Sequence, residues 1–243
     1  MEIGKFIQQK AGYKALIPNK FPPEKGFEFS QKLALKHSTA ERLLGKLDGI
    51  TQLLPDVDFF LFMYIRKDAA SSSQIEGTQA TMIDAIEAEA KTNEFLPKDV
   101  DDILHYIKAL NYGLTRLENF PMSLRFIKEL HKELMKDARN TNFSNPGEFR
   151  NSQNWIGGPS PVNAIYVPPP PVEMQKALNE FENFLHSRDE ILPLLKAGII
   201  HAQFETIHPF LDGNGRTGRL LITFYLWFSK LLDKPVLFLS SYF

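Results

Sequence analysis

The chain has 243 residues, of which 43% are hydrophobic and 23% charged, as in an ordinary soluble protein with one large domain or two small ones. Its net charge of −1 gives no electrostatic reason to expect binding to nucleic acid or to an anionic membrane. Cysteine is absent, which excludes disulfides and thiolate metal sites. The longest apolar stretch, 220–228, has about half the length of a membrane-spanning helix, and the N-terminus lacks a signal-peptide core, so we expect a cytoplasmic protein.

The predicted elements are mostly helices. The first thirty residues contain Pro18, Pro22 and Pro23, and we expect an extended arm that lies on the rest of the protein. Apolar residues then recur at helical spacing, with predicted helices over 31–54, 57 to about 70, 81–90, 101–117, 124 to about 136, 172–186, about 192–208 and 216–232.

A long segment between two of these helices, FSNPGEFRNSQNWIGGPSPVNAIYVPPPP, has a different composition. Its two short β-prone pieces, 153–156 and 164–167, flank glycines and prolines and predict a surface hairpin. The proline run at 168–171 is either a docking motif for another protein or, as is more common, a rigid lead into the next helix. We therefore expect an all-α fold with one β-hairpin flap.

The residues most suited to chemistry lie in one segment, 208–219, with the sequence HPFLDGNGRTGR. Two glycines permit a tight loop just before a helix, and a helix N-terminus with converging backbone N–H groups binds anions. Arg216 and Arg219, three residues apart, are expected to share a face and grip one polyphosphate. Asp212 could hold a hard cation such as Mg²⁺, and His208 could act as a base at neutral pH.

Each of these features has a simpler structural explanation. A single histidine after an apolar helix is usually structural, paired arginines usually form a solvated face, and Asp-Gly-Asn-Gly occurs in ordinary turns and in calcium loops. Their occurrence together within a dozen residues favours a site for displacement at a nucleotide phosphorus. The segment 213–218 also matches GxGxxG, but that fingerprint requires a preceding strand, and here a helix precedes it.

The segment 208–219 fits the signature HxFx(D/E)GNGRxxR of the Fic family at every specified position. Residues 71–90 (SSSQIEGTQATMIDAIEAEA) and the pieces GEFRNSQNWIGG and AIYVPPPP resemble the family's N-terminal inhibitory segment and its substrate flap. The resemblance implies a Fic-like helical bundle with a hairpin flap. Residues 1–95 would be an N-terminal arm and helical region with the inhibitory motif, and 96–243 a Fic core that looks shortened at its C-terminus beside the usual family member.

The resemblance also implies an activity: a protein adenylyltransferase that uses ATP and Mg²⁺ to attach AMP to a Ser, Thr or Tyr hydroxyl. His208 would be the general base and Asp212 the metal ligand. The nucleotide would be held by Gly213, Asn214, Gly215, Arg216 and Arg219, with Asn214 and the neighbouring backbone forming the anion hole. The flap would hold the target as an added strand through Asn154, Trp155, Ile156, Gly157, Ile165, Tyr166 and Val167.

Ser72, Glu76 and Gly77 fit the family's inhibitory motif (S/T)xxxE(G/N), in which the glutamate pairs with the second signature arginine, here Arg219. The alternative is that Glu76 merely caps a helix end. Three functions stay open: AMP transfer; AMP removal or transfer of another phosphate-containing group; and an inactive module that binds nucleotide or a partner. The expected partner is a protein with a hydroxyl side chain, and self-modification and homo-oligomer formation are further options.

Overall fold

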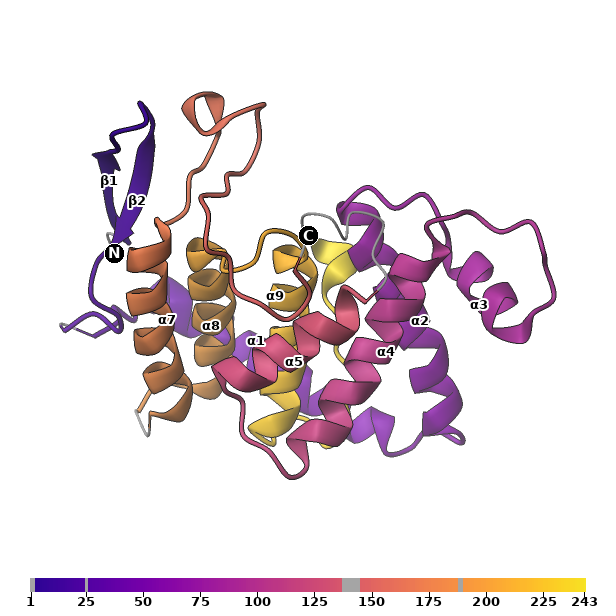
Figure 1. The fold of residues 1–243 in the computed structure, drawn as a ribbon. Helices are drawn as coiled ribbons and strands as arrows, with labels where there is room; N and C mark the ends of the chain where they lie inside the picture. Colours follow the sequence, from indigo (N-terminus) through magenta and orange to yellow (C-terminus); the bar gives the residue numbers. More distant parts are fainter. Residues whose placement is uncertain (1–2, 25, 137–144, 188–189) are drawn as a thin grey trace.

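The computed structural model describes residues 3–24, 26–136, 145–187 and 190–243, so the first two residues of the arm and residues 143–144 of the flap region lie outside it. The described residues form a helical body with a two-stranded sheet beside it (Figure 1). The helices are α1 (Gln31–Thr51), α2 (Val57–Ile75), α3 (Met82–Ala90), α4 (Val100–Leu117), α5 (Leu124–Leu134), α7 (Pro171–His186), α8 (Pro193–Ile207) and α9 (Asn214–Phe228). The predicted helical fold is confirmed, and none of these described helices is long and apolar enough to cross a membrane.

Local sequence signals set most helix starts. The side chains of Ser30, Asp56, Thr81 and Ser123 accept backbone N–H groups at the first turns of α1, α2, α3 and α5. Proline occupies the start of α7 and α8, where no hydrogen-bonded N–H is needed. Seven of the eight ranges match the predictions to within a few residues.

Helix α2 is the exception, because it runs to Ile75 instead of ending near residue 70. Its last turns contain three consecutive serines, which usually favour caps and turns over helix interiors. Here Ser72 and Ser73 are fully buried, and the Ser72 hydroxyl accepts a hydrogen bond from Arg219 of α9. A tertiary contact therefore extends this helix beyond its intrinsic preference.

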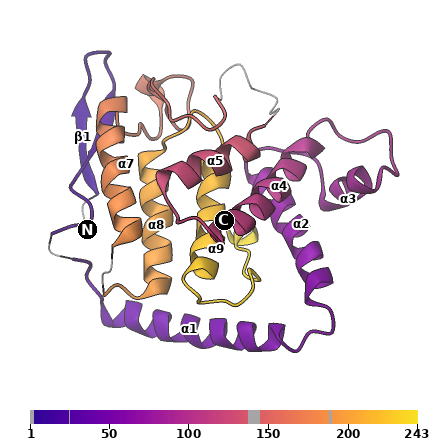
Figure 2. The ribbon, with the colours of Figure 1, turned by 60° about the horizontal axis from the view of Figure 1, so that its bottom comes forward.

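The core is built around α4 and α9. Helix α9 packs on α8, α4, α5 and α2, and α4 also packs on α2, α3 and α5. Gly113 of α4 lies under the ring of Phe224 on α9, where any β-carbon would collide with that ring. Helix α1 runs across the lower ends of α7 and α8 (Figure 2), and Leu44 joins a second cluster with α8, α9 and the chain after them.

The aromatic C-terminal part of the chain is covered only in part. Phe224 is fully buried, and Tyr225, Trp227 and Phe238 pack against the core. Tyr242 and Phe243, by contrast, are 84% and 62% exposed. Phe224, Tyr225, Trp227 and Phe238 are thus covered by the described chain itself.

The N-terminal arm is extended, as predicted, and two of its segments also pair with each other. It forms an antiparallel pair, β1 (Gly4–Gln8) and β2 (Lys14–Pro18), in which Gly4 is opposite Pro18. The sequence did not predict these short strands, because proline usually marks irregular structure. The arm does lie on the body, since β2 contacts α7 and the Leu16 N–H donates to the Val167 carbonyl at 3.0 Å.

The predicted flap is present as a hairpin held by one isolated bridge, between Ile156 and Tyr166. The two N–H groups of Ile156 and Tyr166 bond to each other's carbonyls at 2.8 and 3.1 Å. Pro168 and Pro169 are buried, and their carbonyls accept hydrogen bonds from Gln153 and Arg150. Because α7 begins at Pro171, the structure favours the rigid lead into a helix over a docking motif.

Candidate active site

A cavity of about 360 Å³ lies where α8 ends and α9 begins. His208 follows α8 in the left-handed backbone region, at φ 49°, and Gly213 precedes α9 at φ 74°. These two bends turn the chain back so that α9 packs on α8. The cavity is lined by Glu76, Ile156, His201, Glu205, His208, Leu211, Asp212, Gly213, Asn214, Gly215, Arg219 and Phe243.

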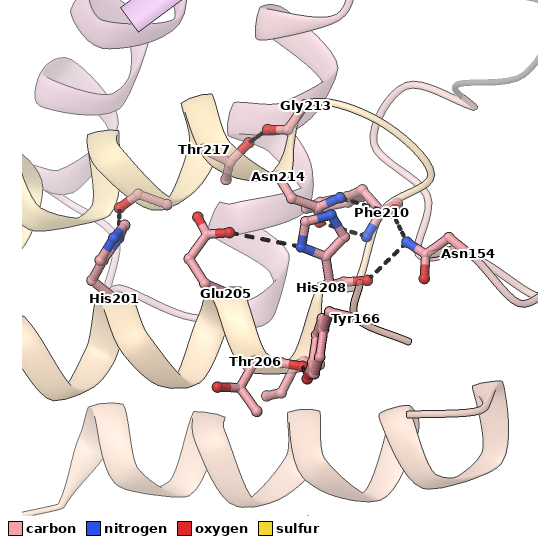
Figure 3. A network of polar contacts seen from close by, with 12 residues as sticks. Asn154, Tyr166, His201, Glu205, Thr206, His208, Phe210, Gly213, Asn214 and Thr217 are labelled. Atoms are coloured by element: carbon pink, nitrogen blue, oxygen red, sulfur yellow. Dashed lines mark hydrogen bonds and ion pairs between the residues drawn. The ribbon is translucent and has the colours of Figure 1, made fainter. Parts of the chain in front are cut away.

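The loop between the two helices is held by the side chain of Asn214. Its amide oxygen accepts from the Phe210 N–H, and its amide nitrogen donates to the Phe210 carbonyl, both at 2.9 Å (Figure 3). Each end of the side-chain amide is thus bonded to Phe210, and the backbone N–H of Asn214 is a further donor at the start of α9. Asp212 is exposed at the rim, and its carboxylate accepts from the Gly213 N–H at 2.6 Å.

Two residues with no role in the sequence analysis also hold this loop. Arg150 is buried and donates from Nε to the His208 carbonyl at 2.9 Å and from Nη2 to the Pro169 carbonyl at 2.6 Å. Burial lowers the pKa of Arg150 to about 10, which leaves it charged at neutral pH. It therefore ties the end of α8 to the flap.

His131 of α5 is the second such residue. Its Nδ1 accepts from the Gly147 N–H at 2.9 Å, so its Nε2 carries the proton and donates to the Asp212 carbonyl, also at 2.9 Å. The ring stacks on Phe210 at 3.6 Å between centroids. Burial lowers the pKa of His131 to about 4, so the ring is neutral at pH 7. No local motif marks Arg150 or His131, because their partners are 58 and 81 residues away in the chain.

The N-terminus of α9 opens into the cavity. Gly213 supplies no side-chain cap, so the first N–H groups of the helix lack the partner that Ser30 or Asp56 supplies elsewhere. The carboxylate of Glu76 lies over this turn, since a β-carbon on Gly215 would collide with its Oε1. A negatively charged group thus occupies the place where a helix N-terminus attracts anions.

Arg219 joins α9 to the end of α2. Its Nε donates to Ser72 Oγ at 2.8 Å, and its Nη2 donates to the Ser72 carbonyl at 2.9 Å and to Glu76 Oε1 at 2.8 Å. The guanidinium is 8% exposed, whereas the Glu76 side chain is 38% exposed. The pair between Glu76 and Arg219 expected from the sequence is therefore formed.

Glu76 also ends α2, as the alternative interpretation required. Gly77 follows in the left-handed region at φ 93°, its N–H bonds the Gln74 carbonyl, and the Thr78 N–H bonds the Ser73 carbonyl. This pattern is a Schellman motif, in which glycine is favoured after the cap. The two interpretations of Glu76 are compatible, because its backbone ends the helix while its side chain reaches Arg219.

The two signature arginines do not grip the cavity from the same side, contrary to the prediction. Arg219 lines the cavity, whereas the Arg216 guanidinium is buried between α4 and α5, 3.3 Å from Met135 Sδ and 3.9 Å from Asp102. Residues three apart are about 60° apart around a helix axis, and long side chains can diverge from there. Arg216 Nε has no hydrogen-bond partner among the described residues.

Three of the predicted docking residues of the flap are anchored to the rest of the protein. Asn154 is buried and donates to the carbonyls of His208 and Phe210 at 3.3 and 2.8 Å. Val167 is buried, and its carbonyl accepts from Leu16. Tyr166 is held too, because its hydroxyl donates to the Thr206 carbonyl at 2.6 Å. The other four predicted docking residues, Trp155, Ile156, Gly157 and Ile165, are exposed.

The comparison with family models identifies the class of protein to which this helical body and its loop belong. The model of the Fic/DOC family matches residues 121–226, and that of the Fic/DOC family N-terminal region matches 34–115. The chain belongs to the Fic/DOC family. The predicted division of the chain at residues 95 and 96 stays a prediction.

Curated relatives match over about half of this chain. Protein adenylyltransferase Fic of Aedes aegypti is 36% identical over 118 residues, which is 48% of this chain and 21% of that protein. The protein of the same name from Drosophila grimshawi is 33% identical over 132 residues, 54% of this chain and 24% of that protein. The matched part of this chain thus spans about a quarter or less of these relatives.

Solved structures share the fold at lower identity. A Fic family protein from Desulfovibrio desulfuricans has a TM-score of 0.66 at 20% identity, over 89% of this chain and 63% of that one. Fic-1 from C. elegans has a TM-score of 0.63 at 20% identity, over 82% of this chain and 59% of that one.

Proposed function

We propose that this protein is an adenylyltransferase that transfers AMP from ATP to a Ser, Thr or Tyr hydroxyl of a target protein and is restrained by Glu76. The observation that carries the proposal is the Glu76 carboxylate, which pairs with Arg219 over the open N-terminus of α9, where a phosphate would bind. The names of the mosquito and fly relatives support the same reaction.

The residues around the cavity suit a polyphosphate. The N–H groups of Asn214 and Gly215 and the guanidinium of Arg219 would hold its oxygens once Glu76 withdraws. Arg216 would reach the inner phosphates only after leaving Met135 and Asp102. The buried and incompletely bonded state of Arg216 is consistent with a ligand-dependent contact.

Asp212 is the candidate ligand for Mg²⁺. Its carboxylate is exposed at the cavity rim and is a hard oxygen donor. The described residues contain no cluster of three or more side chains that could hold a metal, so phosphate and water would complete the coordination. The ion would neutralise charge on the phosphate oxygens.

His208 is the proposed base. It would take the proton of the target hydroxyl while the hydroxyl oxygen bonds to the α-phosphorus and the bond to the β-phosphate breaks, releasing pyrophosphate. Its backbone carbonyl is held by Arg150 and Asn154, so the ring enters the cavity from a rigid support. The exposed hairpin residues beside it would receive the target segment as an added strand.

A second candidate is the removal of AMP from a modified target. Glu76 and His208 line the same cavity, so the Glu76 carboxylate could take a proton from an attacking water.

The test uses the purified chain and its Glu76→Gly variant with ATP labelled at the α-phosphorus and Mg²⁺, alone and with cell lysate. Intact-mass measurement should show AMP added to the protein itself or label transferred to lysate proteins. Label in neither, from variants that bind ATP, would contradict the transfer reaction. Release of AMP from an already modified target would instead support the second candidate.

A further inference from the structure

We propose that Glu205 is a positioning residue for His208: its carboxylate takes the hydrogen bond of the His208 Nδ1–H and so leaves Nε2 free to act. This role rests on the proposed function of His208 as the base. The signature motif gives Glu205 no role, and neither does the resemblance of this chain to the family.

The geometry of α8 brings the two side chains together. Glu205 precedes His208 by three residues, so both project from the same side of the helix end into the cavity. Figure 3 shows the carboxylate facing the imidazole, with Glu205 Oε2 at 3.7 Å from His208 Nδ1. This distance exceeds a hydrogen bond, and closing it requires a shift of roughly 1 Å.

His208 Nδ1 needs such an acceptor. It is shut off from solvent and has no hydrogen-bond partner among the described residues. A neutral histidine that accepts a proton at Nε2 carries its own proton at Nδ1, and a buried N–H without an acceptor is unfavourable. The carboxylate of Glu205, 3.7 Å away, is an acceptor that a small shift would bring within reach of this proton.

Glu205 is poorly explained as a structural residue. Its Oε1 is buried without a hydrogen-bond partner among the described residues, and His208 is its one ion-pair partner there. Gly218 of α9 makes room for it, because a β-carbon on Gly218 would collide with Glu205 Oε1. His201, one turn earlier on α8, is already used, since its Nδ1 donates to the Gly218 carbonyl at 3.0 Å. The Glu205 side chain is 29% exposed, so this carboxylate is partly buried in the cavity wall, and a partly buried carboxylate that lacks strong partners is typical of a functional site.

The pairing has a consequence for the proton transfer. When Nε2 takes the proton of the hydroxyl, the ring becomes an imidazolium, and the adjacent carboxylate stabilises that charge while Glu205 itself gains no proton. The other charged or titratable groups around the pair are His201 on α8, Glu76 of α2 with Arg219 of α9, Asp212 in the loop, and Arg150 and Tyr166 from the flap.

The first experiment reads the His208 tautomer without any turnover. Long-range ¹H–¹⁵N NMR of ¹⁵N-histidine-labelled protein, assigned with His208→Ala, should show the Nδ1–H tautomer in the parent. Glu205→Ala should raise the Nε2–H form, whereas Glu205→Gln, which keeps an acceptor oxygen, should retain most of the Nδ1–H form. The matched control is Glu173→Gln on α7, a half-buried glutamate paired with Lys176, which should leave the His208 signals unchanged.

The second experiment measures AMP transfer in the Glu76→Gly background. Glu205→Ala should lower kcat by about 10-fold or more, with the KM for ATP within about 2-fold, and Glu205→Gln should lie between it and the parent. An Nε2–H tautomer in the parent, or an unchanged tautomer and kcat in Glu205→Ala, would overturn the proposal. If no variant transfers AMP, the function proposed above fails, and the tautomer alone still decides whether Glu205 orients His208.

Discussion

At the scale of single residues, His208 is expected to be needed for AMP transfer but not for ATP binding. The ATP phosphates would be held by the α9 N-terminus, Arg219 and the metal, none of which depends on the imidazole. His208→Ala should therefore lower AMP transfer about 10²- to 10⁴-fold, as is typical for loss of a general base, and leave ATP affinity nearly unchanged. Calorimetry with ATP beside a transfer assay measures both, with His186→Ala at the end of α7 as control. Retained transfer in His208→Ala would remove this residue from its role.

Glu76 and Arg219 form the contact that should set the basal rate. The Glu76 carboxylate takes the hydrogen bond of the guanidinium that would otherwise hold the outer phosphate of ATP. The ATP phosphates would then be misplaced, and a misplacement on the order of 1 Å can slow a reaction about 10²-fold. Glu76→Gly should raise AMP transfer, including self-modification, by about one to two orders of magnitude on that basis. Arg219→Ala also breaks the pair but removes a phosphate ligand, so it should not activate.

The same two variants test the simpler idea that the pair only stabilises the fold. In that case both substitutions would lower the Tm, and neither would raise the rate of transfer. A folded Glu76→Gly protein that binds ATP and is no more active than the parent would contradict the inhibitory role.

At the scale of elements, the turn after α2 holds Glu76 in place. The Thr78 hydroxyl donates to Asp102 at 2.9 Å, and the Gln79 N–H donates to Asp99 at 2.7 Å, so the turn is tied to α4. Thr78→Val removes one tie with little change of shape. It should raise AMP transfer several-fold in the parent, because Glu76 then leaves Arg219 more often.

A double-mutant cycle checks this explanation. In the Glu76→Gly background, Thr78→Val should have no activating effect, because the restraint is already absent. An equal change of rate in both backgrounds would mean that the turn acts on the cavity by another route.

The flap is the second element whose role can be tested. Ile165 is 87% exposed on the hairpin, whereas Tyr166 is bonded to α8 and is a poor site for substitution. Ile165→Asp should reduce modification of the target protein about 10-fold while ATP binding is retained, since a buried charge disfavours the added strand. Val172→Asp, 70% exposed at the start of α7, is the matched control. Equal losses of target modification and of ATP binding would make the flap a structural part of the cavity.

At the scale of the whole molecule, His131 links α5, the segment at Gly147 and the signature loop, and it should make stability depend on pH. Its folded pKa of about 4 lies below the ordinary value of 6.5, so the unfolded chain binds a proton that the folded protein excludes. The contribution of neutral His131 to the free energy of unfolding is therefore present above pH 6.5 and is lost as pH falls towards 4. Between pH 6.5 and 5 the loss is about 2 kcal/mol.

Denaturant unfolding of the parent and of His131→Gln at pH 7 and pH 5 measures this effect. Glutamine keeps an N–H donor for the Asp212 carbonyl but does not titrate. The drop in unfolding free energy should be smaller in His131→Gln by about 2 kcal/mol. An identical drop in both proteins would show that His131 is not the group responsible.

The amino-acid sequence by itself determined the helices and the signature loop, whereas the pairing of Glu76 with Arg219 was expected only from the resemblance to the Fic family. Apolar spacing, caps such as Asp56 and Thr81, and glycines at turns act within a few residues, so they can be recognised locally. The segment containing Glu76 was recognised because it resembles the family's inhibitory motif, since nothing in the local pattern links two residues 143 positions apart.

Only the tertiary structure decided what surrounds that loop. It extended α2 by burying Ser72, paired the N-terminal strands, turned Arg216 towards Met135, and placed His131 and Arg150 against the loop. Each of these contacts joins residues distant in the chain, and its energy depends on which groups burial leaves in need of a partner. The position of Glu205 beside His208 is partly of the same kind: helical spacing puts both on one face of α8, whereas the contact of Glu205 with Gly218 of α9 depends on how the helices pack.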